Sequence, residues 1–179
     1  MATQALTEVE TRRLVLRRWR AADAGWFADL NADARVMRHV GDGRALAADE
    51  SAALVRRIEQ HWEEHGFGLW VAQPRGEDRG IGFVGLAVPS FLPEVLPAVE
   101  VGWRLASAWW GRGLATEGAR AALECAWDGL ELAQVISIID PANAASLRVA
   151  EKLGMRPGRD RIHPGTGRRL RVMELDRPA

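Results

Sequence analysis

Two glycines in a short loop give this sequence its clearest sign of a ligand-binding site. Gly111 and Gly113 lie in Trp110–Ala115, which reads WGRGLA. Glycine lets the backbone turn sharply and leaves main-chain N–H groups without side chains above them. The helical pattern that follows adds unpaired N–H donors and the positive end of a helix dipole at the same place. The loop therefore suits a phosphate or pyrophosphate, to which the Arg112 guanidinium could add a charged contact.

The loop differs from two common phosphate-binding motifs. It lacks the G-x-G-x-x-G spacing of a dinucleotide site and the G-K-[ST] ending of a P-loop, so neither kind of site is predicted. The alternative that remains from the residues alone is a tight strand-to-helix turn that holds no ligand.

The segments on either side of this loop have to position it. Val99–Leu105 alternates apolar residues with Glu100, Gly102 and Arg104, which predicts a half-buried strand. Leu114–Leu130 has apolar residues at spacings of three, four and seven, which predicts an amphipathic helix. We therefore expect the loop to join the end of a central strand to the beginning of a helix.

Three polar side chains in this half of the chain could take part in proton transfer or ligand binding. Glu100 is the only acidic residue inside the predicted strand, where it is either a solvated or ion-paired carboxylate or a general base. Asn143 precedes a helical pattern and is expected to be its N-cap. Ser146 lies in the first turn of that helix, where serine is common without any catalytic role.

Several blocks of the chain resemble, in order, the GNAT superfamily of N-acyltransferases and its RimJ/RimL-like branch. TRRLVLRRWRAADA and NADARVMRHV resemble the opening strand and first helix, and the loop resembles the branch pattern W-G-[KR]-G-x-[AGM]-T-E. DPANAASLRVAEKLGM resembles N-x-x-S-x-x-[VL]-x-E-K-L-G-[FM]. Trp110 stands where the wider superfamily pattern [QR]-x-x-G-x-[GA] has Gln or Arg, a departure that the branch shares.

The resemblance implies an enzyme that uses acetyl-CoA as acyl donor, with no metal and no covalent enzyme intermediate. It implies that the main chain of Trp103 and Leu105 binds the pantetheine amides and that Asn143 contacts the same arm. It implies a pyrophosphate contact from the loop residues, which are Gly111, Arg112, Gly113, Ala115 and Thr116.

The resemblance also implies the two groups that transfer protons. Glu100 would be the general base, acting directly or through water. Ser146 would protonate the departing thiolate, in place of the tyrosine that many members use, and the chain contains no tyrosine.

The acceptor is the part of the reaction that the sequence leaves open. We expect the α-amine of a protein or peptide, because an α-amine with a pKa near 8 is far easier to deprotonate than a lysine. The alternatives are a small amine, such as an amino acid, polyamine or aminoglycoside, and a catalytically silent acyl-CoA-binding module. The loops Val40–Leu46 and Pro89–Ala98 are predicted to build the acceptor pocket. The second loop could instead pack on its own domain or form a subunit interface, so a homodimer is also considered.

Length and composition exclude several other classes. A chain of 179 residues with 47% hydrophobic and 27% charged residues predicts one globular domain over residues 1–179. No apolar run approaches the roughly 18 residues of a membrane span, and no signal peptide is evident, so we expect a cytoplasmic protein without a membrane partner. A net charge of +0 argues against nucleic-acid binding. A lone cysteine, Cys125, allows neither an intrachain disulfide nor a cysteine-based metal cluster.

Charged residues outside the predicted site are expected to be surface features. The arginine pairs Arg12–Arg13, Arg17–Arg18 and Arg168–Arg169 lie in strand-like alternation, which predicts solvated faces. His61 and His65 have the i, i+4 spacing of a helical metal site, but they stand alone and are predicted to be a surface pair.

The order of predicted elements gives a mixed α/β class. Strand Thr11–Trp19 precedes a helix over Asp23–Asn31, with Asp23 as N-cap, and helical pattern continues to Val40. Asp49–Glu64 is a helix that ends at Gly66. The remaining elements are a hairpin of Phe67–Gln73 and Gly80–Val88, the central strand and helix, strand Gln134–Ile139, helix Asn143–Leu153, and a closing hairpin of Arg159–His163 and Arg168–Leu175. We therefore expect a largely antiparallel sheet with one parallel unit around the helix at 114–130.

Overall fold

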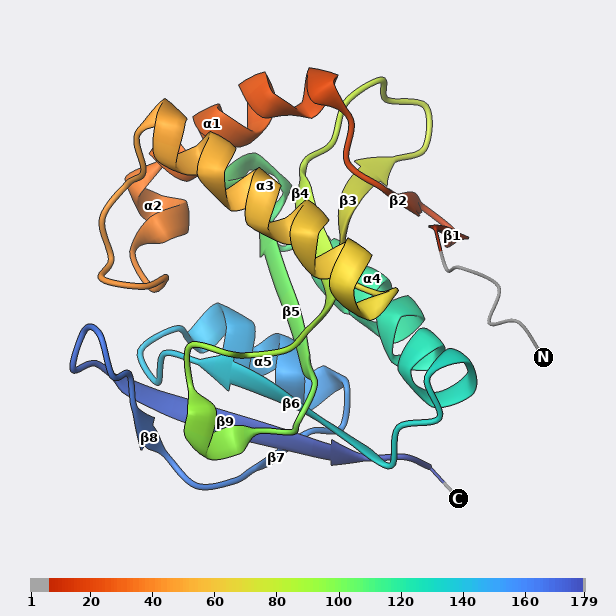
Figure 1. The fold of residues 1–179 in the computed structure, drawn as a ribbon. Coiled ribbons are helices and arrows are strands. Elements are labelled where there is room, and N and C mark those ends of the chain that lie inside the picture. Colours follow the sequence, from red (N-terminus) through yellow and green to blue (C-terminus); the bar gives the residue numbers. More distant parts are fainter. Residues whose placement is uncertain (1–6, 179) are drawn as a thin grey trace.

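The computed structural model, which describes residues 7–178, contains one nine-stranded sheet flanked by helices (Figure 1). Its strands follow the order β1-β2-β3-β4-β5-β6-β9-β7, and β8 pairs with β9. The strand bounds are β1 Glu8–Glu10, β2 Leu14–Arg17, β3 Leu69–Pro74, β4 Gly82–Ala87, β5 Glu100–Leu105, β6 Gln134–Ile139, β7 Arg156–Pro157, β8 Arg161–Ile162 and β9 Arg169–Asp176.

Five α-helices connect or cover the strands. They are α1 Ala24–Ala32, α2 Ala34–Met37, α3 Ala48–His65, α4 Leu114–Glu124 and α5 Ala144–Lys152. The end of α3 is as predicted, since Gly66 takes the left-handed conformation at φ 72° that glycine adopts without strain. The predicted helix over 114–130 is not uniform, because α4 gives way to a π-helical turn over Cys125–Gly129.

The predicted mixture of antiparallel and parallel pairing is confirmed. All paired strands are antiparallel except β5 and β6, which are parallel and are joined through α4. A parallel connection requires a crossover long enough to return to the same end of the sheet, and an α-helix supplies it.

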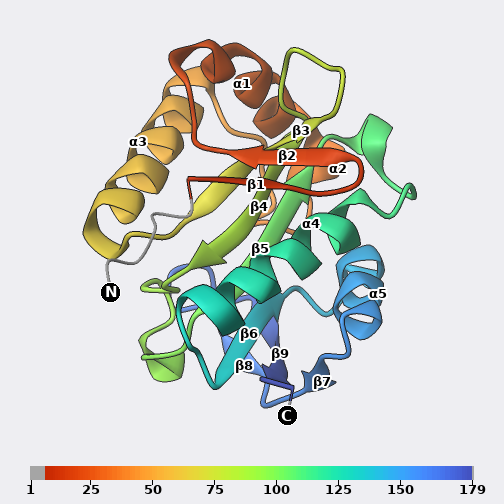
Figure 2. The ribbon, with the colours of Figure 1, turned by 90° about the vertical axis from the view of Figure 1, so that its right-hand side faces the viewer.

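Helices cover both faces of the central strands. Phe83 and Val84 are neighbours in β4, so their side chains point to opposite faces. The Phe83 ring meets Phe27 of α1 with centroids 6.2 Å apart, whereas Val84 packs against Gly118 of α4. Figure 2 shows α1 and α3 at one side of the molecule and α5 at the other. Among the described residues, no helix is both long and apolar enough to cross a membrane.

β5 and β6 meet only near their beginnings. Their pairing is confined to Glu100 opposite Ile136, where the Ile136 N–H donates to the Val99 carbonyl at 2.9 Å. Beyond this point the strands diverge (Figure 1). Because N–H and C=O groups alternate sides along a strand, the main-chain groups of Trp103 and Leu105 face the resulting gap while those of Gly102 and Arg104 face β4.

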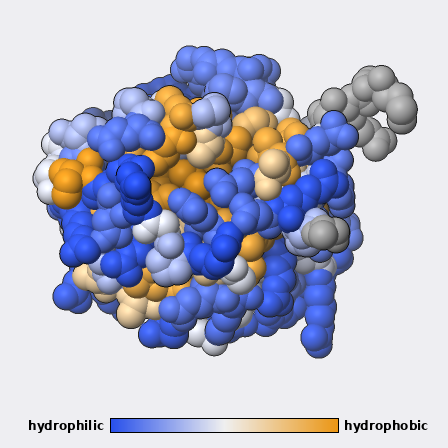
Figure 3. All heavy atoms as spheres, turned by 90° about the horizontal axis from the view of Figure 1, so that it is seen from below, coloured by the Kyte–Doolittle hydropathy of each residue, from blue (hydrophilic) through white to orange (hydrophobic). Residues whose placement is uncertain are grey.

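One face of the molecule carries exposed apolar surface. On the face seen from below, apolar atoms gather near the centre and polar atoms surround them (Figure 3). The large apolar side chains that are exposed include Phe91 and Leu96 of the loop after β4, and Ile162 of β8. The predicted homodimer stays a prediction.

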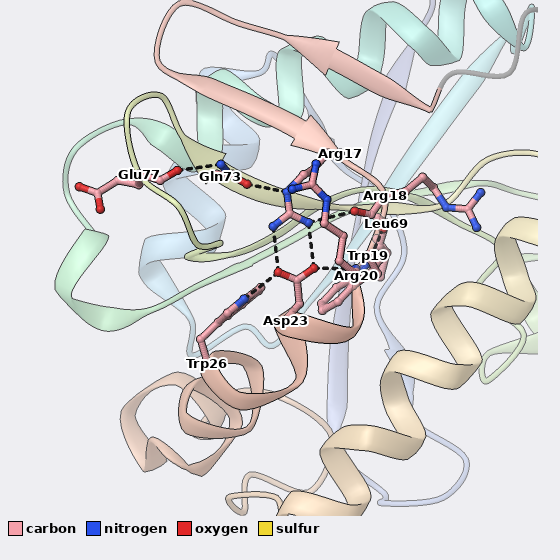
Figure 4. A network of polar contacts seen from close by, with 9 residues as sticks. All are labelled: Arg17, Arg18, Trp19, Arg20, Asp23, Trp26, Leu69, Gln73 and Glu77. Carbon is pink, nitrogen blue, oxygen red and sulfur yellow. Dashed lines mark hydrogen bonds and ion pairs between the residues drawn. The ribbon is translucent and has the colours of Figure 1, made fainter.

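The predicted solvated position of Arg17 is wrong. Its side chain is 4% exposed and forms a two-pronged ion pair with Asp23, at 2.8 Å for each nitrogen–oxygen pair. Asp23 also accepts from the indole N–H of Trp26 and the N–H of Arg20, so it joins β2 to the start of α1 (Figure 4). Asp23 stands at the N-cap position of α1, as predicted, but its side chain makes no cap hydrogen bond to that helix and instead accepts the Arg20 N–H at the start of the 3-10 turn over Ala21–Asp23.

Replacement of Asp23 by asparagine should destabilise the fold by about 3–5 kcal/mol, because it leaves the buried Arg17 charge without its partner. Burial alone would raise the pKa of Asp23, but the hydrogen bonds from Arg17, Trp26 and Arg20 lower it overall. A carboxyl with a lowered pKa stabilises the fold above its unfolded pKa, near 3.8, and this contribution is lost as pH falls through the folded pKa.

The measurement is urea unfolding of both proteins at pH 7 and at decreasing pH. The difference should be large at pH 7 and shrink below about pH 4. Arg156→Gln is the matched control, because Arg156 and Asp176 form an ion pair with side chains 71% and 56% exposed, and such pairs contribute less than about 1 kcal/mol. Equal stability of Asp23→Asn and the wild type would contradict a structural role for the pair.

Candidate functional site

A cavity of about 350 Å³ opens where β5 and β6 diverge. Its walls come from both strands, the beginning of α5, the loops after α2 and β4, and the turn between β8 and β9. Four residues proposed from the sequence line it, namely Glu100, Trp103, Asn143 and Ser146. Val40, Gly41 and Phe91 also line it, so both loops that were predicted to build a pocket contribute to its wall.

Glu100 lies at the point where the two strands part. The Ile138 N–H donates to Glu100 Oε1 at 3.3 Å. This N–H of β6 is therefore bonded to a side chain and not to a main-chain carbonyl of β5. Burial raises the pKa of the Glu100 carboxyl to about 7, against the weaker opposite effect of this hydrogen bond. The group can therefore gain or lose a proton near neutral pH, which suits a general acid or base.

Ser146 and Asn143 are held together at the beginning of α5. The Asn143 side chain accepts the Ser146 N–H at 3.1 Å, which confirms the predicted N-cap. The Trp103 indole N–H of β5 donates to Ser146 Oγ at 3.3 Å. Because the hydroxyl oxygen accepts this bond, its own hydrogen is free to be donated to another group.

The glycine loop is anchored from both sides. Gly111 and Gly113 adopt left-handed conformations at φ 72° and 75°, which explains why glycine is needed at both positions. The Arg112 carbonyl accepts from the Arg13 guanidinium at 2.8 Å, and the Trp110 indole N–H donates to the Leu105 carbonyl at 2.7 Å. These contacts fix the loop and leave open space above Gly111, where an added Cβ would meet nothing within 4 Å.

The beginning of α4 keeps its main-chain donors available. Gly113 is the N-cap of α4 and supplies no side-chain hydrogen bond, so the first N–H groups of the helix have no side-chain partner there. The Arg112 guanidinium lies 4.8 Å above the Trp109 ring, and Thr116 is buried. The loop therefore offers main-chain N–H groups near two guanidinium groups, that of Arg112 and that of Arg13, which donates to the Arg112 carbonyl.

The proposed site residues fall into two groups at opposite ends of β5. Glu100 lies at the beginning of the strand, beside the cavity, whereas Leu105 ends it and leads into the loop. Leu105 and the loop residues Gly111, Arg112, Gly113, Ala115 and Thr116 are absent from the cavity wall. An elongated ligand lying along the gap would meet both groups.

A cluster of charged residues at the cavity was missed by the sequence analysis. Asp140 Oδ2 accepts from Arg168 at 2.6 Å and lies 3.2 Å from His39 Nδ1. His163 stacks on Phe91 with ring centroids 5.3 Å apart. The predicted solvated position of Arg168 is only partly correct, since its side chain is 32% exposed and also lies against the cavity wall. Asp140 is the sequence feature that could have indicated this cluster, because it is a carboxylate that directly follows the buried strand β6.

His61 is not simply a surface histidine paired with His65, because its ring also bonds to the main chain of two other segments. The Val88 N–H donates to His61 Nε2 at 2.9 Å, and His61 Nδ1 lies 2.9 Å from the Phe67 carbonyl. Burial lowers the pKa of the imidazole. The side chain therefore ties α3 to the beginning of the loop that carries Phe91.

Comparison with protein families and sequences gives a consistent result. The acetyltransferase (GNAT) domain family matches residues 13–156. FsC-acetyl coenzyme A-N(2)-transacetylase of Aspergillus fumigatus is 31% identical over 169 residues, covering 87% of this chain and 67% of the relative. YkkB of Bacillus subtilis is 37% identical over 91 residues. That match covers 51% of this chain and about half of the relative, 52% of its length.

Solved structures share the fold over nearly the whole chain. An acetyltransferase from Agrobacterium tumefaciens has a TM-score of 0.81 and 25% identity, covering 95% of this chain and 94% of that one. RimL, a ribosomal L7/L12 α-N-protein acetyltransferase in complex with coenzyme A, has a TM-score of 0.75 and 12% identity, covering 94% and 97%. At 12% identity, the similarity to RimL shows the fold alone.

Proposed function

The chain belongs to the GNAT acetyltransferase family, and from this premise we propose that it transfers an acetyl group from acetyl-CoA to an α-amine. The observation that carries the proposal is the Glu100 carboxyl at the opening between β5 and β6, whose pKa is about 7. An α-amine has a pKa near 8, within about one unit of this base, whereas a lysine lies more than three units above it. A protein or peptide N-terminus is the acceptor that we place first, and the W-G-R-G-L-A-T-E run supports the RimJ/RimL-like branch.

A small-molecule amine is the second candidate acceptor. The Aspergillus relative is named as an N(2)-transacetylase, and it is 31% identical to this chain over the 169 matched residues. The chemistry at Glu100 is the same for both acceptors, because each presents an amine that must lose a proton before it attacks.

The donor acetyl-CoA fits the features of the gap and the loop. The N–H groups of Gly111, Arg112, Gly113 and Ala115, with the beginning of α4 that includes Thr116, would bind the pyrophosphate. The free main-chain groups of Trp103 would pair with the pantetheine amides much as a peptide adds to a sheet edge. The Leu105 carbonyl already accepts from Trp110, so Leu105 would offer its N–H alone. Asn143 would contact the same arm.

Each step of the transfer has a residue to assist it. Glu100 takes a proton from the ammonium group, directly or through water, and the neutral amine attacks the thioester carbonyl. A main-chain N–H at Trp103 or Leu105 polarises that carbonyl as negative charge develops on its oxygen. The carbon–sulfur bond then breaks, and the Ser146 hydroxyl donates its proton to the thiolate. The second proton of the attacking nitrogen is released as the amide forms and returns to the Ser146 oxygen, directly or through water. The products are the acetylated amine and free coenzyme A, with no acyl group on the protein.

Replacement of Gly113 by valine should weaken coenzyme A binding at least tenfold. The side chain would stand beside the N–H groups that face the pyrophosphate, and φ 75° is strained for valine. Gly76→Val is the matched control, because Gly76 in the β3–β4 turn has φ 83° and an added Cβ there meets nothing within 4 Å, while at Gly113 it meets only Arg13 Nη2 at 3.5 Å, an ordinary contact. Calorimetry should show weak binding in the first variant and normal binding in the second. Equal coenzyme A affinity of folded Gly113→Val and Gly76→Val would contradict the loop assignment.

The pH dependence of kcat/KM tests the role of Glu100. In the wild type, activity should rise with pH through about 7, as the Glu100 carboxyl loses its proton. In Glu100→Gln only the amine remains to be deprotonated, so the midpoint should move up to about 8 and the rate should fall most below pH 7. A profile with the same midpoint in both proteins would show that Glu100 is not the base.

Ser146→Ala provides the contrast in the same experiment. Loss of a general acid should lower turnover about 10²- to 10⁴-fold at every pH without moving the midpoint near 7. A catalytically silent acyl-CoA-binding module predicts coenzyme A binding with no acetylated product in any variant. Mass spectrometry of the amine after incubation with acetyl-CoA distinguishes these results.

The cytoplasmic location, like the absence of nucleic-acid and membrane partners, stays a prediction.

A further inference from the structure

Arg104 is a further charged residue at the cavity, and the proposed reaction does not use it. Its Nη1 donates to Asn31 Oδ1 at 2.8 Å, and its guanidinium lies 5.0 Å above the Phe83 ring. Burial lowers the pKa of this arginine to about 10, and no carboxylate of residues 7–178 raises it. The guanidinium therefore lines the cavity as a cation without a carboxylate partner.

Arg104 and Glu100 point to the same face of β5. They are four residues apart, and side chains two and four residues apart in a strand share a face. Gly102 lies between them on that face, and a Cβ added there would meet nothing within 4 Å. The cavity floor therefore has a carboxyl group at one end, a guanidinium at the other and open space between them.

Both groups carry a desolvation penalty that the protein offsets only in part, through the Ile138 N–H at Glu100 and the Asn31 side-chain carbonyl at Arg104. Transfer of a charged group from water into a protein is costly unless it is paired. Elsewhere in this chain the buried arginine Arg17 has a carboxylate partner in Asp23, so the two unpaired groups at the cavity differ from its structural ion pair. A ligand with an ammonium group at one end and a carboxylate at the other would pair with both.

Asn31 holds the guanidinium in place without neutralising it. Asn31 is fully buried, its side-chain amide N–H donates to Ser51 Oγ at 2.8 Å, and its main-chain carbonyl accepts from the Leu46 N–H. The hydrogen bond from Arg104 to Asn31 uses one of the five N–H groups of a guanidinium. The remaining N–H groups can meet a carboxylate in the two-pronged geometry that arginine favours.

We propose that the acceptor carries a carboxylate, which Arg104 binds while the amine lies at Glu100. This inference rests on the proposed acetyl transfer and narrows its acceptor to amines that bear a negative charge. Four residues of strand span roughly 13 Å, and the two side chains shorten that distance. The acceptor carboxylate therefore lies several bonds from the amine, as in an acidic amino acid or a peptide with an acidic residue near its N-terminus.

The test compares acceptors that differ only in this carboxylate. Free aspartate and glutamate are compared with asparagine and glutamine, and peptides that begin with an acidic residue are compared with their amide counterparts. The wild type should acetylate the acidic member of a pair with a kcat/KM about 10- to 100-fold higher, the range of a hydrogen-bonded charge pair. Whichever set shows the preference identifies the source as a free amino acid or a peptide.

Two substitutions locate the preference at Arg104. Arg104→Gln should lose the preference mainly through a higher KM for the acidic acceptor, with less than threefold change for the amide, and Arg104→Lys should restore part of it. Asn31→Asp should have the same effect as Arg104→Gln while keeping the guanidinium, because it supplies an internal carboxylate partner. Thermal unfolding of each variant shows that it is folded.

Three results would count against the inference, and they separate it from the proposed function. Equal kcat/KM for acidic and amide acceptors in the wild type would overturn the inference alone. An equal fall for both acceptors in Arg104→Gln would also overturn it, because it would show a purely structural role in which Arg104 only packs on Phe83. Absence of acetylation with every amine would overturn the proposed function and the inference with it.

Discussion

The parallel strands β5 and β6 form one main-chain contact and then part, and the whole site depends on this incomplete ladder. Ile136 donates to the Val99 carbonyl, but two residues later the Ile138 N–H donates to the Glu100 side chain instead of a carbonyl of β5. An interior strand ordinarily satisfies its N–H and C=O groups within the sheet. Here the strand keeps free donors and acceptors inside the molecule, beside a carboxyl group that marks the beginning of the gap.

Buried charges in this chain serve two different purposes. Arg17 and Asp23 neutralise one another and join β2 to the start of α1. Glu100 and Arg104 are desolvated without neutralising one another, and both line the cavity. Because an unpaired, desolvated charge weakens a fold, our proposal assigns these two groups to ligand binding rather than to stability.

The sequence predicted the elements whose evidence is local. The period of apolar residues predicted α3 and its end at Gly66, the hairpin of β3 and β4, and the loop that begins α4 at Gly113. These features depend on residues within one or two turns of each other, so a pattern along the chain reveals them. Asn143 as the N-cap of α5 belongs to the same class.

The contacts that the sequence analysis missed join segments far apart in the chain. His39, Asp140 and Arg168 come from the loop after α2, the end of β6 and the turn before β9. An arginine that alternates with apolar residues looks the same whether its strand face meets water or a helix, so Arg17 and Arg168 were expected on the surface. The open floor over Gly102 likewise depends on the helices and loops that surround it, and no pattern within β5 reveals it.

The central claim is that the main chain of β5 binds acyl-CoA through the groups that face the gap. Residue-resolved amide hydrogen exchange, with and without coenzyme A, tests it most directly. We expect bound coenzyme A to slow exchange at Trp103 and Leu105 and at the amides of the loop over 111–116. Gly102 and Arg104, whose amides face β4, should change little. Unchanged exchange at Trp103 and Leu105 in protein saturated with coenzyme A would contradict the account.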